Sequence, residues 1–198
     1  MNTRFRFAGL TVLGLMLAVP AAHALSISAP MSRSFSGYNG QPATVTGTLS
    51  SGYTGTLIAD SDGTVTFTYL GNESGDVNRF NFAVGGQTLT EAAALGTSIY
   101  GSVGAGALLF SFTDLTRSST FYNDGNRRAL VFVPNVTTNG YGTFQYLIGF
   151  NDNGSSDGDF DDFVVGVNFA SVPEPGTLAL LGLGLMGIGL SRRRTAKA

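Results

Sequence analysis

The 198-residue chain contains no cysteine and no tryptophan, and its single histidine, His23, lies near the N-terminus. Its one lysine is Lys197, so residues 25–172 hold none of these four residue types. Without cysteine there are no disulfides, and a fold of this size must depend on core burial or on bound metal. Without histidine or cysteine there is no Ser-His or Cys-His nucleophile pair and no conventional zinc site. The remaining function classes are carboxylate chemistry, binding of hard cations, or no catalysis at all.

The charge of the chain is unevenly distributed. Residues 25–172 carry twelve acidic residues against five arginines, a net charge of −7, whereas the whole chain has a net charge of −2. Proteins that bind nucleic acid need a basic surface. We therefore predict no nucleic-acid partner and a preference for cations.

The N-terminus has the pattern of a signal peptide. Two arginines within the first six residues precede an apolar stretch over residues 8–22, and Ala22 and Ala24 complete an A-x-A cleavage site. We predict a signal peptide over residues 1–24 and a mature chain that starts at Leu25. A short membrane anchor that stays attached is the alternative.

The C-terminal tail, residues 172–198, has three parts: a proline-bracketed motif, an apolar run over residues 177–190 and a basic end over residues 192–197. The apolar run predicts a single transmembrane helix, although its ~21 Å is short against a hydrocarbon core of ~30 Å. Cytoplasmic arginines would leave residues 25–172 outside the inner membrane. The motif residues are Pro173, Glu174 and Pro175, and the residues of the membrane stop are Arg192, Arg193 and Arg194.

This order of motif, apolar run and arginine cluster resembles the PEP-CTERM tail of exported bacterial proteins, over residues 172–194. The resemblance implies that a membrane enzyme, exosortase, cleaves near the motif and passes the protein to the cell surface or the medium. Exosortase and the inner membrane are then transient partners. An ordinary permanent tail anchor is the alternative.

The segment between the two ends has the pattern of a sheet protein. Residues 64–70 alternate threonine with valine, phenylalanine and tyrosine, which is typical of a half-buried strand. Eight or nine short strands predict an all-β, jelly-roll-like antiparallel β-sandwich over residues 43–171, with a closed barrel as the alternative. Residues 25–42 are predicted to be a flexible lead-in, and Thr90 to Leu95 a short helix. The other strand candidates are residues 43–49, 54–59, 79–84, 97–102, 107–113, 128–134, 142–150 and 162–169.

An acidic loop between two apolar strands is the main site candidate. Like charges packed beside a core are costly unless a cation neutralises them, and calcium takes six to eight oxygen ligands. The loop is not an EF-hand, because the closing glutamate is absent and a strand follows. We predict a calcium site here; a solvated acidic loop is the alternative. The predicted ligands are Asp152, Asp157, Asp159, Asp161 and Asp162.

The same loop resembles a motif of exported bacterial β-domains, including PEP-CTERM proteins, in which Gly-Phe-Glu-Asp is followed by Asp-x-Asp-Phe-Asn-Asp. Residues 149–152 and 157–162 fall on it, with Asn151 in place of Glu and Asp161 in place of Asn. The resemblance implies cation binding, with calcium as the ion. Residues 67–80 are similar to another segment of PEP-CTERM proteins, and its Glu73 would join the site if the two loops share one end of the domain.

These observations predict a non-enzymatic protein, a structural or adhesive component of the cell surface or biofilm matrix. One alternative is a calcium-stabilised carbohydrate-binding module that holds extracellular polysaccharide on exposed tyrosines, of which the chain has seven. Two or three tyrosines on one open face would favour it. The other alternative is a glycoside hydrolase with two carboxylates facing each other across a cleft.

Overall fold

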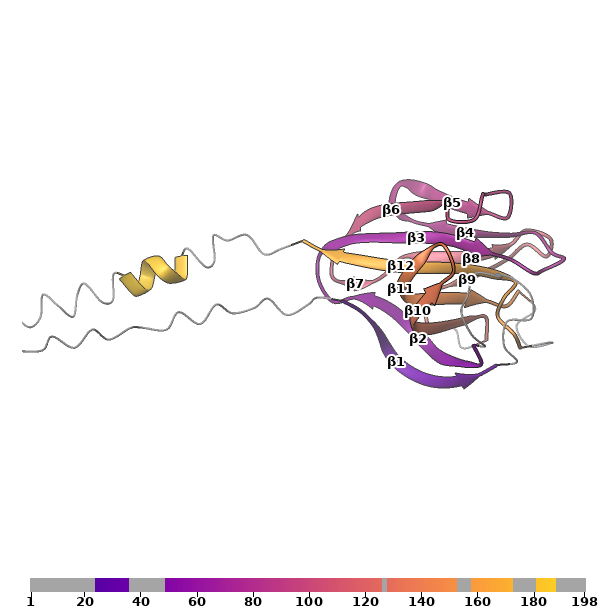
Figure 1. The fold of residues 1–198 in the computed structure, drawn as a ribbon, viewed down its shortest axis with the longest axis horizontal. Helices are drawn as coiled ribbons and strands as arrows, with labels where there is room; N and C mark the ends of the chain where they lie inside the picture. Colours follow the sequence, from indigo (N-terminus) through magenta and orange to yellow (C-terminus); the bar gives the residue numbers. More distant parts are fainter. Residues whose placement is uncertain (1–23, 36–48, 126–127, 153–157, 173–180, 188–198) are drawn as a thin grey trace, which may run out of the picture.

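The computed structural model describes residues 24–35, 49–125, 128–152, 158–172 and 181–187. Two antiparallel sheets make up the domain within residues 24–172 (Figure 1), which confirms the prediction of an all-β fold. The first sheet has the order β1-β2-β10-β11-β12-β3-β6 with β7 paired to β2, and the second has the order β5-β4-β8-β9. The strands are β1 (Leu25–Ser34), β2 (Ser51–Ala59), β3 (Gly63–Gly71), β4 (Asn78–Phe82), β5 (Gln87–Thr90), β6 (Ser98–Val103), β7 (Gly106–Ala107), β8 (Phe110–Asp114), β9 (Ser119–Tyr122), β10 (Leu130–Thr138), β11 (Gly142–Phe150) and β12 (Phe163–Ser171), with a short 3-10 helix η1 (Val84–Gly86) before β5.

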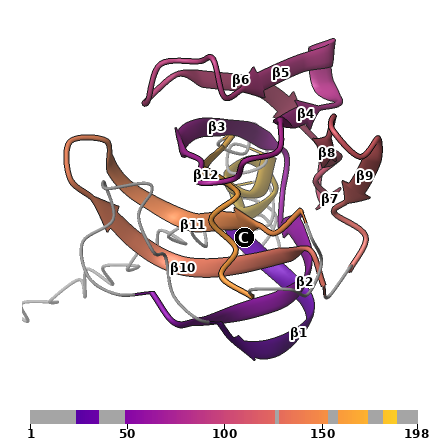
Figure 2. The same cartoon turned by 90° about the vertical axis from the view of Figure 1, so that its right-hand side faces the viewer.

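The two sheets share one hydrophobic core. Phenylalanines alternate along β4 and β8 and point toward the first sheet, as the period of two requires. Phe112 of β8 stacks on Phe150 of β11 with ring centroids 4.8 Å apart. Figure 2 shows β4, β8 and β9 on one side of β3, β12 and β11. Aromatic contacts between the sheets therefore hold the domain together.

A second, smaller core covers the opposite face of the first sheet. Val131, Leu147 and Val164 point to this face, where Phe35 and Phe160 pack on them. The central strands β10, β11 and β12 are thus buried on both faces, which explains their nearly continuous apolar sequences.

The N-terminal part of the domain differs from the prediction of a flexible lead-in over residues 25–42. The first ten of these residues form β1, an edge strand paired with β2. Most of its residues are partly or fully exposed, and its register shifts between Ser28 and Met31, so its sequence carries little alternation. Residues 36–42 lie outside the described part of the chain.

The predicted helix from Thr90 to Leu95 is wrong. Thr90 ends β5, and two turns follow, closed by hydrogen bonds from Ala93 N–H to the Thr90 carbonyl and from Thr97 N–H to the Ala94 carbonyl. Pairing of β5 with β4 takes up the residues before the turns, and a segment this short has too little helical stability to compete.

Both ends of the domain meet at the turn between β2 and β3. The N–H of Asp60 donates to the carbonyl of Ala24 at 3.1 Å, and the N–H of Val172 donates to the carbonyl of Asp62 at 3.1 Å. The start of β1 and the end of β12 therefore lie at the same end of the domain (Figure 1).

The two predicted processing segments adjoin this turn, and most of their residues lie outside the described ones. Residues 181–187 of the predicted transmembrane run are helical. Within the described part of the chain, no helix has the length and apolar character needed to cross a membrane. Among the predicted cleavage, sorting-motif and membrane-stop residues, those outside the described part are Ala22, Pro173, Glu174, Pro175, Arg192, Arg193 and Arg194.

Candidate metal centre at the acidic end

Four loops meet at the end of the domain opposite the β2–β3 turn. The loops β3–β4 and β11–β12 lie at this end because β3 ends and β12 begins there. The β5–β6 loop and the end of β8 join them. We call the acidic residues that these segments bring together the acidic end: Glu73, Asp76, Glu91, Asp114, Asp152, Asp159, Asp161 and Asp162.

Three of these residues form what we call the first carboxylate group: Glu73, Asp159 and Asp161. One carboxylate oxygen from each lies within 4.8 Å of the others. Asp161 is fully buried and Asp159 is buried, whereas Glu73 is exposed. The Glu73 N–H donates to the Asp161 carbonyl at 3.1 Å, which fixes the two loops against each other.

The conformation of Phe160 explains how Asp159 and Asp161, which flank it in the sequence, come close to the same point. It has a φ of 66°, a left-handed conformation that is rare for a bulky residue, and its side chain is fully buried. The ring packs edge-on against Phe35 with centroids 5.8 Å apart, and the Arg33 guanidinium carbon lies 5.0 Å from its centre. With Phe160 anchored in the second core, Asp159 and Asp161 lie on either side of it and approach Glu73.

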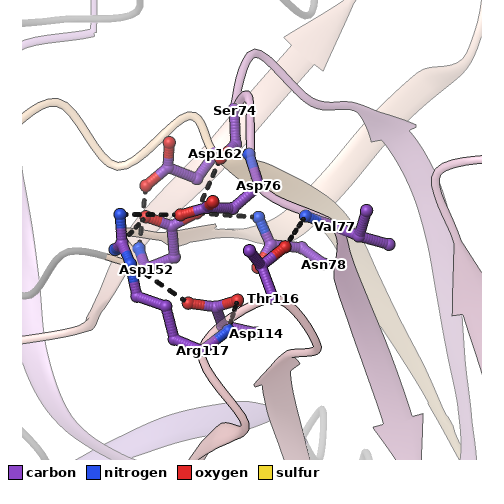
Figure 3. A network of polar contacts seen from close by, with 9 residues as sticks. All are labelled: Ser74, Asp76, Val77, Asn78, Asp114, Thr116, Arg117, Asp152 and Asp162. Atoms are coloured by element: carbon purple, nitrogen blue, oxygen red, sulfur yellow. Dashed lines mark hydrogen bonds and ion pairs between the residues drawn. The ribbon is translucent and has the colours of Figure 1, made fainter.

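The second carboxylate group consists of Asp76, Asp114 and Asp152, again with one oxygen from each within 4.8 Å of the others. Figure 3 shows the Arg117 side chain reaching into this group. Its Nη2 lies 2.7 Å from Asp76 Oδ2, its Nη1 lies 3.5 Å from Asp152 Oδ1 and its Nε lies 3.9 Å from Asp114 Oδ2. A polar recess of about 290 Å³ opens beside these residues.

Hydrogen bonds hold Asp152 in place. Its Oδ2 accepts from Ser74 Oγ at 2.6 Å and from the Asn78 side-chain amide at 3.0 Å, while its N–H donates to Asp162 Oδ2 at 2.8 Å. Asp162 therefore supports the start of the loop and belongs to neither carboxylate group.

Burial, more than the nearby carboxylates, shifts the proton affinity of Glu91. Burial raises the pKa of Glu91 above its usual range, the hydrogen bond from the Asn78 N–H opposes this, and the charges of Asp152 and Asp76 add to the rise. Burial, and secondly the charge of Glu91, raises the pKa of Tyr69 to about 12. The acidic end therefore disfavours further negative charge.

The five predicted ligands do not form one shell. The structure brings Asp159 and Asp161 together, places Asp152 in the second group and gives Asp162 a supporting role, whereas Asp157 lies outside the described residues. Glu73 joins the first group because the two loops do share one end of the domain.

Sequence reasoning missed Asp76, Glu91 and Asp114 of the acidic end, and Arg117 beside them. They come from loops that pack together only in the folded protein. The available signal was the i,i+3 spacing of Asp114 and Arg117, which the structure uses for an ion pair.

The donors of the first group suit a hard cation. All are carboxylate oxygens that lie within 4.8 Å of one another, close enough to bind one calcium ion, whose oxygen ligands lie at about 2.3–2.6 Å. Carbonyl oxygens and water would complete six to eight ligands.

The exposed tyrosines do not form a platform within the described part of the chain. Tyr53 lies on β2, Tyr100 on β6 and Tyr122 on β9. β2 and β6 are distant strands of one sheet, and β9 belongs to the other sheet. The arrangement needed for the carbohydrate-binding alternative is therefore not met by these three residues.

Comparison with families of known proteins identifies the tail of the chain. Residues 171–194 match the model of the PEP-CTERM protein-sorting motif. Comparison with curated proteins and with solved structures gave no match. The match begins in the last residue of β12, so the motif directly follows the folded domain. The chain thus carries a PEP-CTERM sorting motif, as the sequence predicted, and this motif indicates an exported protein that interacts transiently with exosortase in the membrane.

Proposed function

We propose that this protein is an exosortase-sorted, non-catalytic component of the cell surface or extracellular matrix, a β-sandwich whose acidic end holds a structural calcium ion. The observation that carries the calcium site is the first carboxylate group, in which Glu73, Asp159 and Asp161 converge from two loops. The sorting motif supports the export of the protein.

Burial makes the first carboxylate group costly without a cation. Asp161 is fully buried and Asp159 nearly so, and an ionised carboxylate removed from water costs several kcal/mol unless a positive charge compensates it. A divalent cation between the three carboxylates supplies that charge and joins the β3–β4 loop to the β11–β12 loop. Calcium fits better than magnesium, because magnesium requires near-ideal octahedral geometry at 2.0–2.1 Å.

Thermal unfolding of the full-length chain in detergent tests the proposal, with calcium, with magnesium and with a chelator. Calcium at about 100 times Kd should stabilise the fold by ~2.7 kcal/mol, a rise of several degrees in Tm. Glu73→Gln should abolish the rise, whereas Asp124→Asn, an exposed residue of the β9–β10 loop, should keep it. An equal response to magnesium, or no response to calcium, would reject the site.

A further inference from the structure

The two carboxylate groups contain the same number of carboxylates but differ in their surroundings. Each brings three carboxylates within 4.8 Å, yet the second group also contains a guanidinium. Each guanidinium nitrogen of Arg117 faces a different carboxylate: Nη2 faces Asp76, Nη1 faces Asp152 and Nε faces Asp114. One arginine thus contacts all three members (Figure 3).

The backbone places Arg117 for this role. Asp114 Oδ1 accepts the N–H of Arg117 at 2.9 Å, which closes a turn at the end of β8. The Leu115 N–H donates to the Val77 carbonyl at 2.8 Å, and the Val77 N–H donates to Thr116 Oγ1 at 2.9 Å. These hydrogen bonds fix the turn against the β3–β4 loop that carries Asp76. The side chain of Arg117 therefore extends from a backbone position close to the three carboxylates.

Donors already engage several oxygens of the second group, whereas Asp114 Oδ2 has no hydrogen-bond partner among the described residues and lies 3.9 Å from Arg117 Nε. Asp152 Oδ2 accepts two hydrogen bonds, from Ser74 and from Asn78, while its Oδ1 faces Arg117. Asp76 Oδ2 faces Arg117 at 2.7 Å. A metal ion would have to displace these donors. The planar fork of a guanidinium matches carboxylate geometry, which suits Arg117 to hold these carboxylates.

We propose that Arg117 is the permanent cation of the second carboxylate group, so that the acidic end binds one divalent cation, in the first group, and the removal of Arg117 creates a second site. This inference rests on the proposed calcium site. Its physical basis is Asp114, which is fully buried and would need a new counter-ion once the guanidinium is gone.

Isothermal titration of calcium into the chelator-treated full-length chain in detergent counts the ions. We expect one ion per chain for the wild type and two for Arg117→Gln. Asp114→Asn added to Arg117→Gln should return the count to one. Arg79→Gln is the charge-matched control: Arg79 lies on β4 beside Asn78 and forms no ion pair with another described residue, so its count should stay at one.

The outcomes separate the inference from the proposed function. Two ions in the wild type, or the same count in Arg117→Gln and wild type, would overturn the inference. No ion in the wild type but one in Arg117→Gln would overturn the proposed function and uphold the role of Arg117. If Arg117→Gln does not fold, Asp76→Asn provides the test: it should keep the single ion, and its loss would overturn the inference.

Discussion

The N–H of Glu73 donates a 3.1 Å hydrogen bond to the carbonyl of Asp161, although the two residues lie in loops far apart in the sequence. The bond joins the β3–β4 loop to the β11–β12 loop, and the side chains of the same two residues belong to the first carboxylate group. Binding of the proposed ion would therefore be coupled to attachment of the two loops, because both would depend on the same pair of residues.

Asp161→Asn should change the free energy of unfolding in opposite directions with and without calcium. In chelator the substitution removes a buried negative charge and should stabilise the fold by about 1 kcal/mol or more. At calcium concentrations about 100 times Kd it should lose most of the ~2.7 kcal/mol from binding. Urea unfolding in both conditions measures the two values, and a change of the same sign in both would contradict the prediction.

Glu91 should make the metal-free protein less stable as the pH rises. Its pKa is raised in the folded state, so the fold favours its protonated form. That contribution is complete below the unfolded pKa, about 4.3, and is lost as the pH rises through the folded pKa. Relative to Glu91→Gln, the wild type should therefore lose stability as the pH rises from about 4 through the raised folded pKa of Glu91.

The measurement is urea unfolding of both chains in chelator over that pH range. The comparison with Glu91→Gln cancels the titration of distant groups. A stability difference that stays constant, or that grows in favour of the wild type as the pH rises, would contradict the assignment of the raised pKa to Glu91.

Gly166 of β12 leaves space for the ring of Phe144. A Cβ at this position would lie 2.5 Å from the ring, and the ring belongs to the second core. Gly166→Ala should therefore cost about 1–3 kcal/mol by overpacking. Adding Phe144→Leu should recover part of that loss, whereas Gly75→Ala should cost little, because nothing lies within 4 Å of the added Cβ.

Phe112 should be more important to stability than its neighbour Phe121. Phe112 is fully buried and contacts rings of both sheets, including Phe150 and Phe80, whereas Phe121 is partly buried. Phe112→Ala should cost about 3–5 kcal/mol of unfolding free energy, and Phe121→Ala clearly less. Equal losses in chemical denaturation would show that the shared core does not join the sheets at Phe112.

The strands that could be predicted from the sequence are the ones with strong apolar content. β3 alternates cleanly, and β10, β11 and β12 carry long apolar runs because both of their faces are buried. β1, β5 and β9 were missed: β5 and β9 are short, and β1 is an edge strand with many exposed polar residues. Their pairing depends on the neighbouring strand more than on local sequence.

Prediction of the candidate site from local sequence was limited in the same way. Asp159 and Asp161 could be predicted because they lie in one acidic stretch, and Glu73 only on the condition that the two loops share one end of the domain. The second group could not be predicted as a unit, since Asp76 and Asp152 lie in two separate loops and Asp114 ends β8. Nothing in local sequence shows that Arg117 reaches all three.

The turn between β2 and β3 holds both ends of the domain, while the acidic end lies at the far tips of the same strands. The hydrogen bonds between antiparallel strands run perpendicular to the strand direction. A force applied between the tail and a ligand at the acidic end would therefore act along the strands and load many of these bonds together in shear. β12, which ends at the tail and pairs on both sides with β11 and β3, would carry that load through the middle of the first sheet.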